Sequence, residues 1–241
     1  MIRLRREPLS PESLAFLEAR AQKVLTAKVR REEALRLWEM QGNQAFQEVR
    51  STLKAMAAGL ERCMYCEDSA GTDIEHFWPK SEYPERAFNW DNYLLACSSC
   101  NSNHKRERFP LDAAGAPLLI DPTAEDPRDH LALSPRTGQY VARTPKGGQS
   151  IEVFGLHRDV LEKGRRDAWG KIPALLRCYD EACSEGDWHH ALEVQRIICR
   201  SPFASVFARF IEIATGAPAS PLIKASVLAV LEKYPDIKTW L

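Results

Sequence analysis

The sequence has no excess of either charge. Its 241 residues include 33 Lys and Arg and 33 Asp and Glu. A positive field over the whole molecule, the simplest sign of a nucleic-acid-binding protein, is therefore excluded. The charge is locally uneven, because residues 1–60 and 143–177 carry more base than acid, whereas residues 61–110 carry more acid. The two flanks are the better candidates for a phosphate-binding surface, although solvated helix faces produce the same excess.

The sequence also has no apolar run close to the roughly 20 residues that cross a bilayer. Its first residues, MIRLRREPLSPES, contain no apolar segment of the kind found in signal peptides. We therefore expect a cytoplasmic protein that does not bind a membrane. Seven cysteines in such a chain argue against a disulfide framework and direct attention to their spacing.

Helical patterns fill the first sixty residues. Ser10 is a suitable N-cap and Pro11 a suitable first residue for a helix that continues to Leu25. A second helical stretch covers residues 32–58, with Gly42 as a candidate break. Residues 1–60 are therefore predicted to form an N-terminal helical region, arranged as a hairpin.

Helical patterns return at residue 158, and the predicted C-terminal helical region covers residues 158–241. Its helices are expected over residues 158–183, 187–215 and 220–234, with Pro202 as a break in the second. Cysteines 178, 183 and 199 lie here without the spacing of paired metal ligands. Isolated free cysteines of this kind are predicted to be small buried apolar residues.

Between the two helical regions the helical period is lost. Residues 61–115 are crowded with Cys, His, Trp and Asn, which indicates a segment organised by chemistry rather than by packing. Residues 116–157 are predicted to be a linker with short strands: one at residues 118–121, and a hairpin that ends at residues 151–154. The predicted fold class is therefore α+β and mostly helical.

Two CxxC pairs enclose the middle of the chain. Cys63 and Cys66 form the first pair, and Cys97 and Cys100 form the second. Two such turns present four thiolates to one tetrahedral ion, which predicts a closed structural zinc site with no position open to a substrate. The alternatives are two unrelated pairs or a redox motif.

A reactive strip lies between the two pairs and continues past the second. It reads DIEHFWPK from Asp73 to Lys80 and WDNYLLA from Trp90 to Ala96, and after Cys100 it reads NSNHK. Neighbouring side chains on a strand point to opposite faces, so Glu75 could bind a hard divalent ion while His76 faces the attacking water.

This combination resembles the HNH endonucleases, also called the ββα-metal fold, in which two strands and a short helix carry the site. The resemblance implies that His76 is the general base that activates water for attack on a phosphodiester. It implies that Glu75, where the family commonly has Asp, and Asn101 bind the catalytic metal. Asn92 would order the loop that orients His76. The expected architecture is a zinc-stapled HNH module flanked by helical regions.

The chain departs from the family pattern after Asn101. Members that bind a transition metal often place a His four residues later, where this chain has Lys105, which suits a phosphate better than a metal. His104 is a further candidate ligand on the same helix face. Asp73 shares the strand face of Glu75 and is either a second ligand or an outer carboxylate. Oxygen donors dominate this set, which favours Mg²⁺ or Mn²⁺ as the catalytic cofactor.

The wider wording is similar to the HNH subunit of Septu-type anti-phage systems, the PtuB-like proteins, some of which accompany retrons. The phrases that carry this resemblance fall within residues 61–167 and include CMYCE, DIEHFWPKS, FNWDNYLLACSSCN, LLIDPTAEDPRDHL and FGLHRDVLEKGRR. The resemblance implies a PtuA-like partner, an ATPase of the ABC or SMC type, for which the helical ends are candidate docking surfaces. His157, where relatives often have Asn, is not expected to be catalytic.

Three hypotheses for the function follow. The leading one is a defence endonuclease that cuts DNA, with RNA, including tRNA, as the alternative substrate. The second is a zinc-ribbon binding module that cuts nothing, although such a module does not need His76 together with Glu75 and Asn101. The third is a homing or restriction nuclease that works alone, which is ranked lower because no DNA-reading helix or basic arm is apparent.

Overall fold

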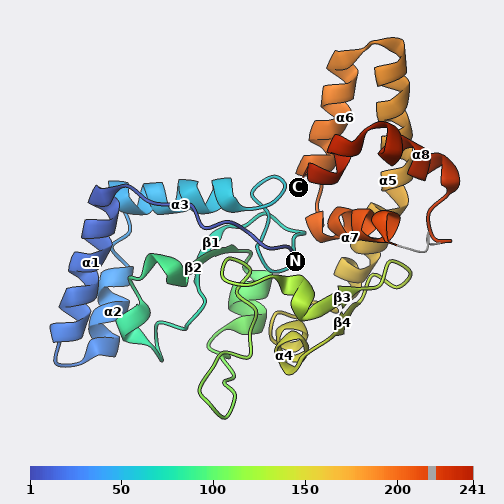
Figure 1. The fold of residues 1–241 in the computed structure, drawn as a ribbon. Coiled ribbons are helices and arrows are strands. Elements are labelled where there is room, and N and C mark those ends of the chain that lie inside the picture. The colour runs from blue at the N-terminus through green and yellow to red at the C-terminus, as the bar shows by residue number, and fades with distance from the viewer. Residues whose placement is uncertain (217–220, 241) are drawn as a thin grey trace.

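The computed structural model describes residues 1–216 and 221–240. Two helical regions lie on either side of a central part that holds two small sheets (Figure 1). The helices before the sheets are α1 (Pro11–Thr26), α2 (Arg30–Trp38) and α3 (Gln44–Met56). The helices after them are α4 (Pro145–Val153), α5 (Asp159–Glu185), α6 (Trp188–Arg200), α7 (Ala204–Thr215) and α8 (Ala225–Lys233). The predicted class, mostly helical α+β, is confirmed.

The N-terminal region contains three helices rather than the predicted hairpin. Ser10 caps α1 as expected, because its hydroxyl accepts a hydrogen bond from the Ser13 amide. The stretch predicted over residues 32–58 is interrupted after Glu39, and Asn43 begins α3 by accepting from the Phe46 amide. The predicted break near Gly42 is thus the end of α2 and the start of a separate helix, α3. As a result α2 packs against α1 and the 3-10 helix at Pro84–Arg86, whereas α3 packs against β2.

The central sheet is a pair of short antiparallel strands, β1 (Asp73–His76) and β2 (Tyr93–Ala96). Glu75 pairs with Leu94 and His76 with Tyr93 in its register. A seven-residue π-helix, η3 (Ser99–Lys105), follows β2. The order of strand, strand and short helix is the one that the resemblance implied.

The second sheet corrects two predictions about residues 116–157. Its strands are β3 (Leu131–Leu133) and β4 (Tyr140–Ala142), whereas residues 118–121 form no strand and residues 145–153 are helical. Thr144 and Pro145 begin α4 as its N-cap and first residue. A side chain on Gly147 would come within 2.0 Å of the His130 carbonyl oxygen, so this glycine permits close helix packing rather than a turn.

The C-terminal region is built on α5, which is 27 residues long and continues through Pro173. It ends at Gly186, which adopts the left-handed conformation with φ of 75°, and α6 returns beside it (Figure 1). The break predicted at Pro202 separates α6 from α7. Residue 220, the predicted start of the last helix, lies outside the described residues.

The three isolated cysteines are less buried than predicted. Cys178 is exposed, and Cys183 and Cys199 are half-buried. Among the described residues no helix is both long and apolar enough to span a membrane.

Candidate active site and zinc site

Four cysteine side chains converge beside the central sheet. The Sγ atoms of Cys63, Cys66, Cys97 and Cys100 all lie within 4.8 Å of one another, and all four residues are buried. Cys63 and Cys66 lie in the turns that follow α3. Cys97 directly follows β2, and Cys100 lies in η3. The predicted four-sulfur cluster is thus assembled, and its donor set fits zinc.

Part of this cluster is disposed to ionise. Hydrogen bonds from Cys100 and Cys63 lower the pKa of Cys66 to about 6. A guanidinium approaches from outside the cluster, since Arg158 Nη2 donates to Cys100 Sγ at 3.4 Å. Arg158 is the residue before α5, so the C-terminal region contributes directly to the four-cysteine cluster. Arg158 could not be predicted as part of this cluster from the sequence, because nothing in its spacing relates it to the cysteines.

His76 is buried at the end of β1. Its Nε2 lies 3.0 Å from the carbonyl oxygen of Ala87. Because a carbonyl oxygen only accepts, Nε2 carries the proton and Nδ1 keeps its lone pair. Burial, followed by the charge of Lys80, lowers the pKa of His76 to about 3. The imidazole is therefore neutral near pH 7, with one nitrogen free to accept a proton.

Two neighbours fix the orientation of this ring. Trp38, at the end of α2, packs against it with the ring centroids 4.2 Å apart. Tyr93, opposite His76 on β2, meets the ring edge-on and donates from its hydroxyl to the same Ala87 carbonyl at 2.8 Å. No role for Trp38 could be predicted from the sequence, because it lies 38 residues before His76 and belongs to a different element.

Asn92 closes the loop between β1 and β2. Its Oδ1 accepts from the Trp78 amide at 2.7 Å, and its Nδ2 donates to the carbonyl oxygens of Trp78 and Arg86, both at 3.0 Å. Arg86 directly precedes Ala87, the residue whose carbonyl holds His76. The amide of Asn92 therefore sits where it can order the loop, which is the role that the resemblance implied for it.

Asp73 and Asn101 meet across the strand and the π-helix. Asn101 Nδ2 donates to Asp73 Oδ2 at 3.1 Å, so Asn101 Oδ1 is left to other partners. Glu75 lies on the same strand face as Asp73, and its carboxylate is buried. Asp73 thus contacts Asn101, and Glu75 and Asn101 line the same cavity, whereas Asp73 is not among the residues that line it.

A cavity of about 110 Å³ lies over these residues. It is lined by Leu35, Ile74, Glu75, His76, Pro79, Lys80, Ser81, Asn101, Arg106 and Glu107. Lys80 and Arg106 give the wall two cations, although neither was assigned a role from the sequence. Both are adjacent to or within the motifs quoted above, and this was the only signal for them.

Two predicted roles are corrected by the geometry of η3. Lys105, expected to bind a phosphate, is buried, and its Nζ lies 2.6 Å from Glu75 Oε1 and 2.9 Å from the His76 carbonyl oxygen. His104, a candidate metal ligand, instead packs against Gly155 and is not among the cavity residues. In a π-helix the turn is wider than in an α-helix. The side chain four positions after Asn101, rather than three, therefore reaches the site.

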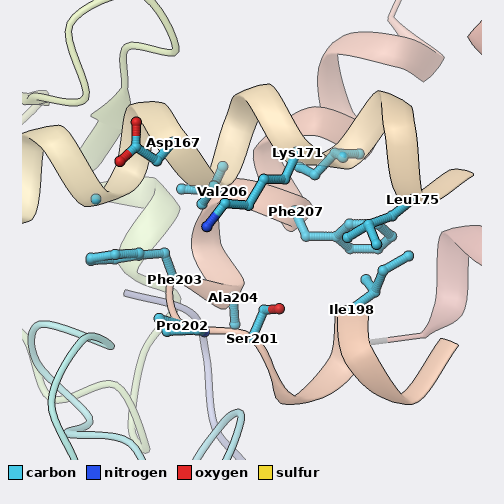
Figure 2. A pocket seen from close by; sticks show the side chains of 13 residues that line it. Asp167, Lys171, Leu175, Ile198, Ser201, Pro202, Phe203, Ala204, Val206 and Phe207 are labelled. Atoms are coloured by element: carbon cyan, nitrogen blue, oxygen red, sulfur yellow. The ribbon is translucent and has the colours of Figure 1, made fainter. Parts of the chain in front are cut away.

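A second cavity, of about 170 Å³, lies between α5 and the segment that joins α6 to α7 (Figure 2). Most of its lining is apolar, and Asp167 and Lys171 are the charged residues among those that line it. It has no histidine and no pair of carboxylates, so its chemistry does not suit phosphodiester hydrolysis. The smaller cavity beside His76 is the candidate active site.

Comparison with known proteins agrees with this choice. Residues 63–107 match the family described as HNH endonuclease. The chain is also similar to the Septu protein PtuB of Bacillus mycoides (strain KBAB4), with 34% identity over 148 residues that cover 48% of this chain and 49% of that protein. It is 30% identical to the Septu protein PtuB of Bacillus thuringiensis over 107 residues, covering 40% and 37% of the two chains.

These matches confirm the resemblance stated from the sequence. The matched HNH segment contains the four cysteines, the strand with His76 and the π-helix. The chain spans about half or less of the length of each curated relative.

Proposed function

We propose that this chain is a metal-dependent HNH endonuclease that hydrolyses phosphodiester bonds, most readily in DNA. We further propose that it acts in the cytoplasm as the nuclease subunit of a Septu-type anti-phage complex, together with a PtuA-like ATPase. The observation that carries the proposal is the held imidazole of His76. It is anchored through Nε2 and lines a cavity whose wall also carries oxygen donors and two cations.

In this proposal His76 takes a proton from the attacking water at Nδ1. The Ala87 carbonyl and the Trp38 ring hold the imidazole in place, so the free nitrogen keeps its direction during the step. Lys80 and Arg106 bind the phosphate oxygens and balance the charge that builds on them.

The oxygen donors fit a hard divalent cation. Glu75 Oε1 is buried and makes no well-aligned hydrogen bond to any residue in the described part of the chain. Glu75 and Asn101, with Asp73 beside them, would hold Mg²⁺ or Mn²⁺, which when bound neutralises charge at the scissile phosphate. The four cysteines would hold a separate structural zinc.

The test is incubation of the purified chain with duplex DNA, single-stranded DNA and RNA in Mg²⁺ or Mn²⁺. Each reaction is run with and without a PtuA-like ATPase and ATP. We expect cleavage of DNA that depends on the divalent ion and is lost in EDTA. Cleavage of RNA alone would make RNA rather than DNA the substrate, because the proposed chemistry acts on the phosphodiester and does not depend on the sugar. No cleavage in any reaction would favour a zinc-ribbon binding module.

A further inference from the structure

Lys105 places its ammonium beside Glu75, a residue that lines the candidate active site. Its side chain is 1% exposed, and its ammonium lies 2.6 Å from Glu75 Oε1. The same ammonium donates to the His76 carbonyl oxygen at 2.9 Å. A buried lysine is rare unless it is paired, and this one is paired with the carboxylate that is proposed to bind the catalytic ion.

The local backbone holds Lys105 in this position. The π-helix is documented by i to i+5 hydrogen bonds, from the Asn103 amide to the Ser98 carbonyl at 3.0 Å and from the Arg106 amide to the Asn101 carbonyl at 2.7 Å. Arg106 then adopts a φ of 51°, which is unusual for a residue with a side chain. Short π-helical segments are frequent at functional sites. The wide turn points Lys105 inward while Arg106 stays exposed at the cavity.

The contact between Lys105 and Glu75 is close but poorly aligned. Glu75 Oε1 makes no hydrogen bond of good geometry, although the ammonium lies 2.6 Å away. The two groups form a close, buried ion pair. An ammonium has three donors and no lone pair, so it can balance a carboxylate but cannot bind a metal.

We propose that the ammonium of Lys105 competes with the catalytic divalent cation for Glu75. The proposal rests on the assignment of Glu75 as a ligand of the nuclease site. A cation that binds Glu75 meets the positive charge of Lys105 at ion-pair distance and is repelled by it. The ammonium must therefore leave Glu75 when the cation enters, and the resting site binds the cation weakly.

The test compares Mn²⁺ binding by the full, zinc-loaded chain and by Lys105→Met, with the free ion measured by electron paramagnetic resonance. Methionine keeps the length of the side chain and removes its charge. We expect Lys105→Met to bind Mn²⁺ at least tenfold more tightly, and we expect Glu75→Gln in the same background to abolish the gain. Lys146→Met is the matched control, because Lys146 forms a half-buried ion pair with Glu125 at 2.9 Å. It should bind Mn²⁺ as the unchanged chain does.

A merely structural lysine would give a different result. Lys105→Met would then lose stability without gaining affinity, and equal or weaker Mn²⁺ binding would overturn the proposal. If the variant does not fold, acetic anhydride labelling of the unchanged chain decides, read by mass spectrometry. Saturating Mn²⁺ should increase acetylation of Lys105 but not of Lys146, and unchanged labelling of Lys105 would overturn the proposal.

The outcomes separate this inference from the proposed function. A chain that cleaves nucleic acid with Mn²⁺ but shows no gain in Lys105→Met refutes the competition alone. A gain in affinity without any cleavage supports the competition and refutes the nuclease. Absence of Mn²⁺ binding by both proteins refutes the competition, whatever the cleavage assay shows.

Discussion

The two sites of the central module are built on opposite plans. The cysteine cluster is closed and chemically uniform, with four buried thiolates within 4.8 Å of one another. The cavity beside His76 is open and mixed, with carboxylates, an amide, an imidazole and cations contributed by β1, η3 and the loops between. A bound ion would use all four sulfur ligands of the cysteine cluster, whereas the cavity beside His76 leaves polar groups exposed for a reaction. Under the proposed function, the closed site would stabilise the module and the open site would carry out the reaction.

The strongest way to break this comparison is to remove a ligand from the closed site. Cys100→Ser should release zinc and unfold the central module, because structural zinc contributes about 10 kcal/mol or more to the folding of small zinc domains. Zinc content and thermal unfolding by circular dichroism measure the effect. Cys178→Ser is the control, since Cys178 is exposed and should change neither quantity. A Cys100→Ser chain that keeps one zinc and its unfolding temperature would contradict the structural role.

A substitution at Asn92 tests whether the cavity beside His76 also depends on an ordered loop between β1 and β2. Asn92→Ala removes three hydrogen bonds to the loop, at roughly 1 kcal/mol each, so the free energy of unfolding should fall by about 3 kcal/mol. The cleavage rate should fall as well, because the loop carries the Ala87 carbonyl. Urea unfolding and a cleavage assay follow the two effects. Asn89→Ala removes one exposed cap and should do little, and equal behaviour of the two variants would argue against the ordering role of Asn92.

The pH dependence of stability tests the burial of His76. The folded chain holds the imidazole neutral down to about pH 3, whereas the unfolded chain protonates it below its ordinary pKa of about 6.5. The unfolded state therefore binds more protons in this window, and stability is lost as the pH falls through it. Between pH 7.5 and pH 5 the unchanged chain should lose about 2 kcal/mol more stability than His76→Gln. Parallel losses in the two proteins, measured by urea unfolding, would show that the imidazole is not held neutral.

Arg158 offers the finest test, because it joins the closed site to the C-terminal region. Arg158→Met removes the hydrogen bond to Cys100 Sγ and should cost about 1 to 2 kcal/mol of zinc affinity. Release of zinc to a chromogenic chelator should accelerate about tenfold. Arg166→Met, an exposed change within α5, provides the control. Identical release rates would show that the guanidinium does not stabilise the thiolates.

The closed site could be predicted from the sequence almost completely. The spacing of each CxxC pair is enough to predict its geometry, because the turn brings its two sulfur atoms together whatever surrounds it. His76 and Asn92 were assigned from the wording of the HNH resemblance, and the structure places both in a fitting arrangement. The direction of Lys105 could not be predicted, since nothing in SCNSNHK distinguishes a π-helix from an α-helix. Trp38 and Arg158 were missed because tertiary packing, not spacing, brings them to the site.

The hairpin predicted within residues 116–157 was wrong at its end for a similar reason. Gly147 and Gly148 lie inside α4, where the close approach of the His130 carbonyl explains Gly147. A glycine that permits packing and a glycine that permits a turn have the same letter, and only the partner distinguishes them.

The central claim is that His76 activates water in a nuclease site. The most direct measurement is the rate of DNA cleavage by His76→Ala and by the unchanged chain in saturating Mn²⁺, with zinc content and thermal unfolding recorded for both. We predict a loss of about 10² to 10⁴ in rate, while the variant keeps its zinc and folds cooperatively. A folded His76→Ala protein that cleaves at the unchanged rate would contradict the claim.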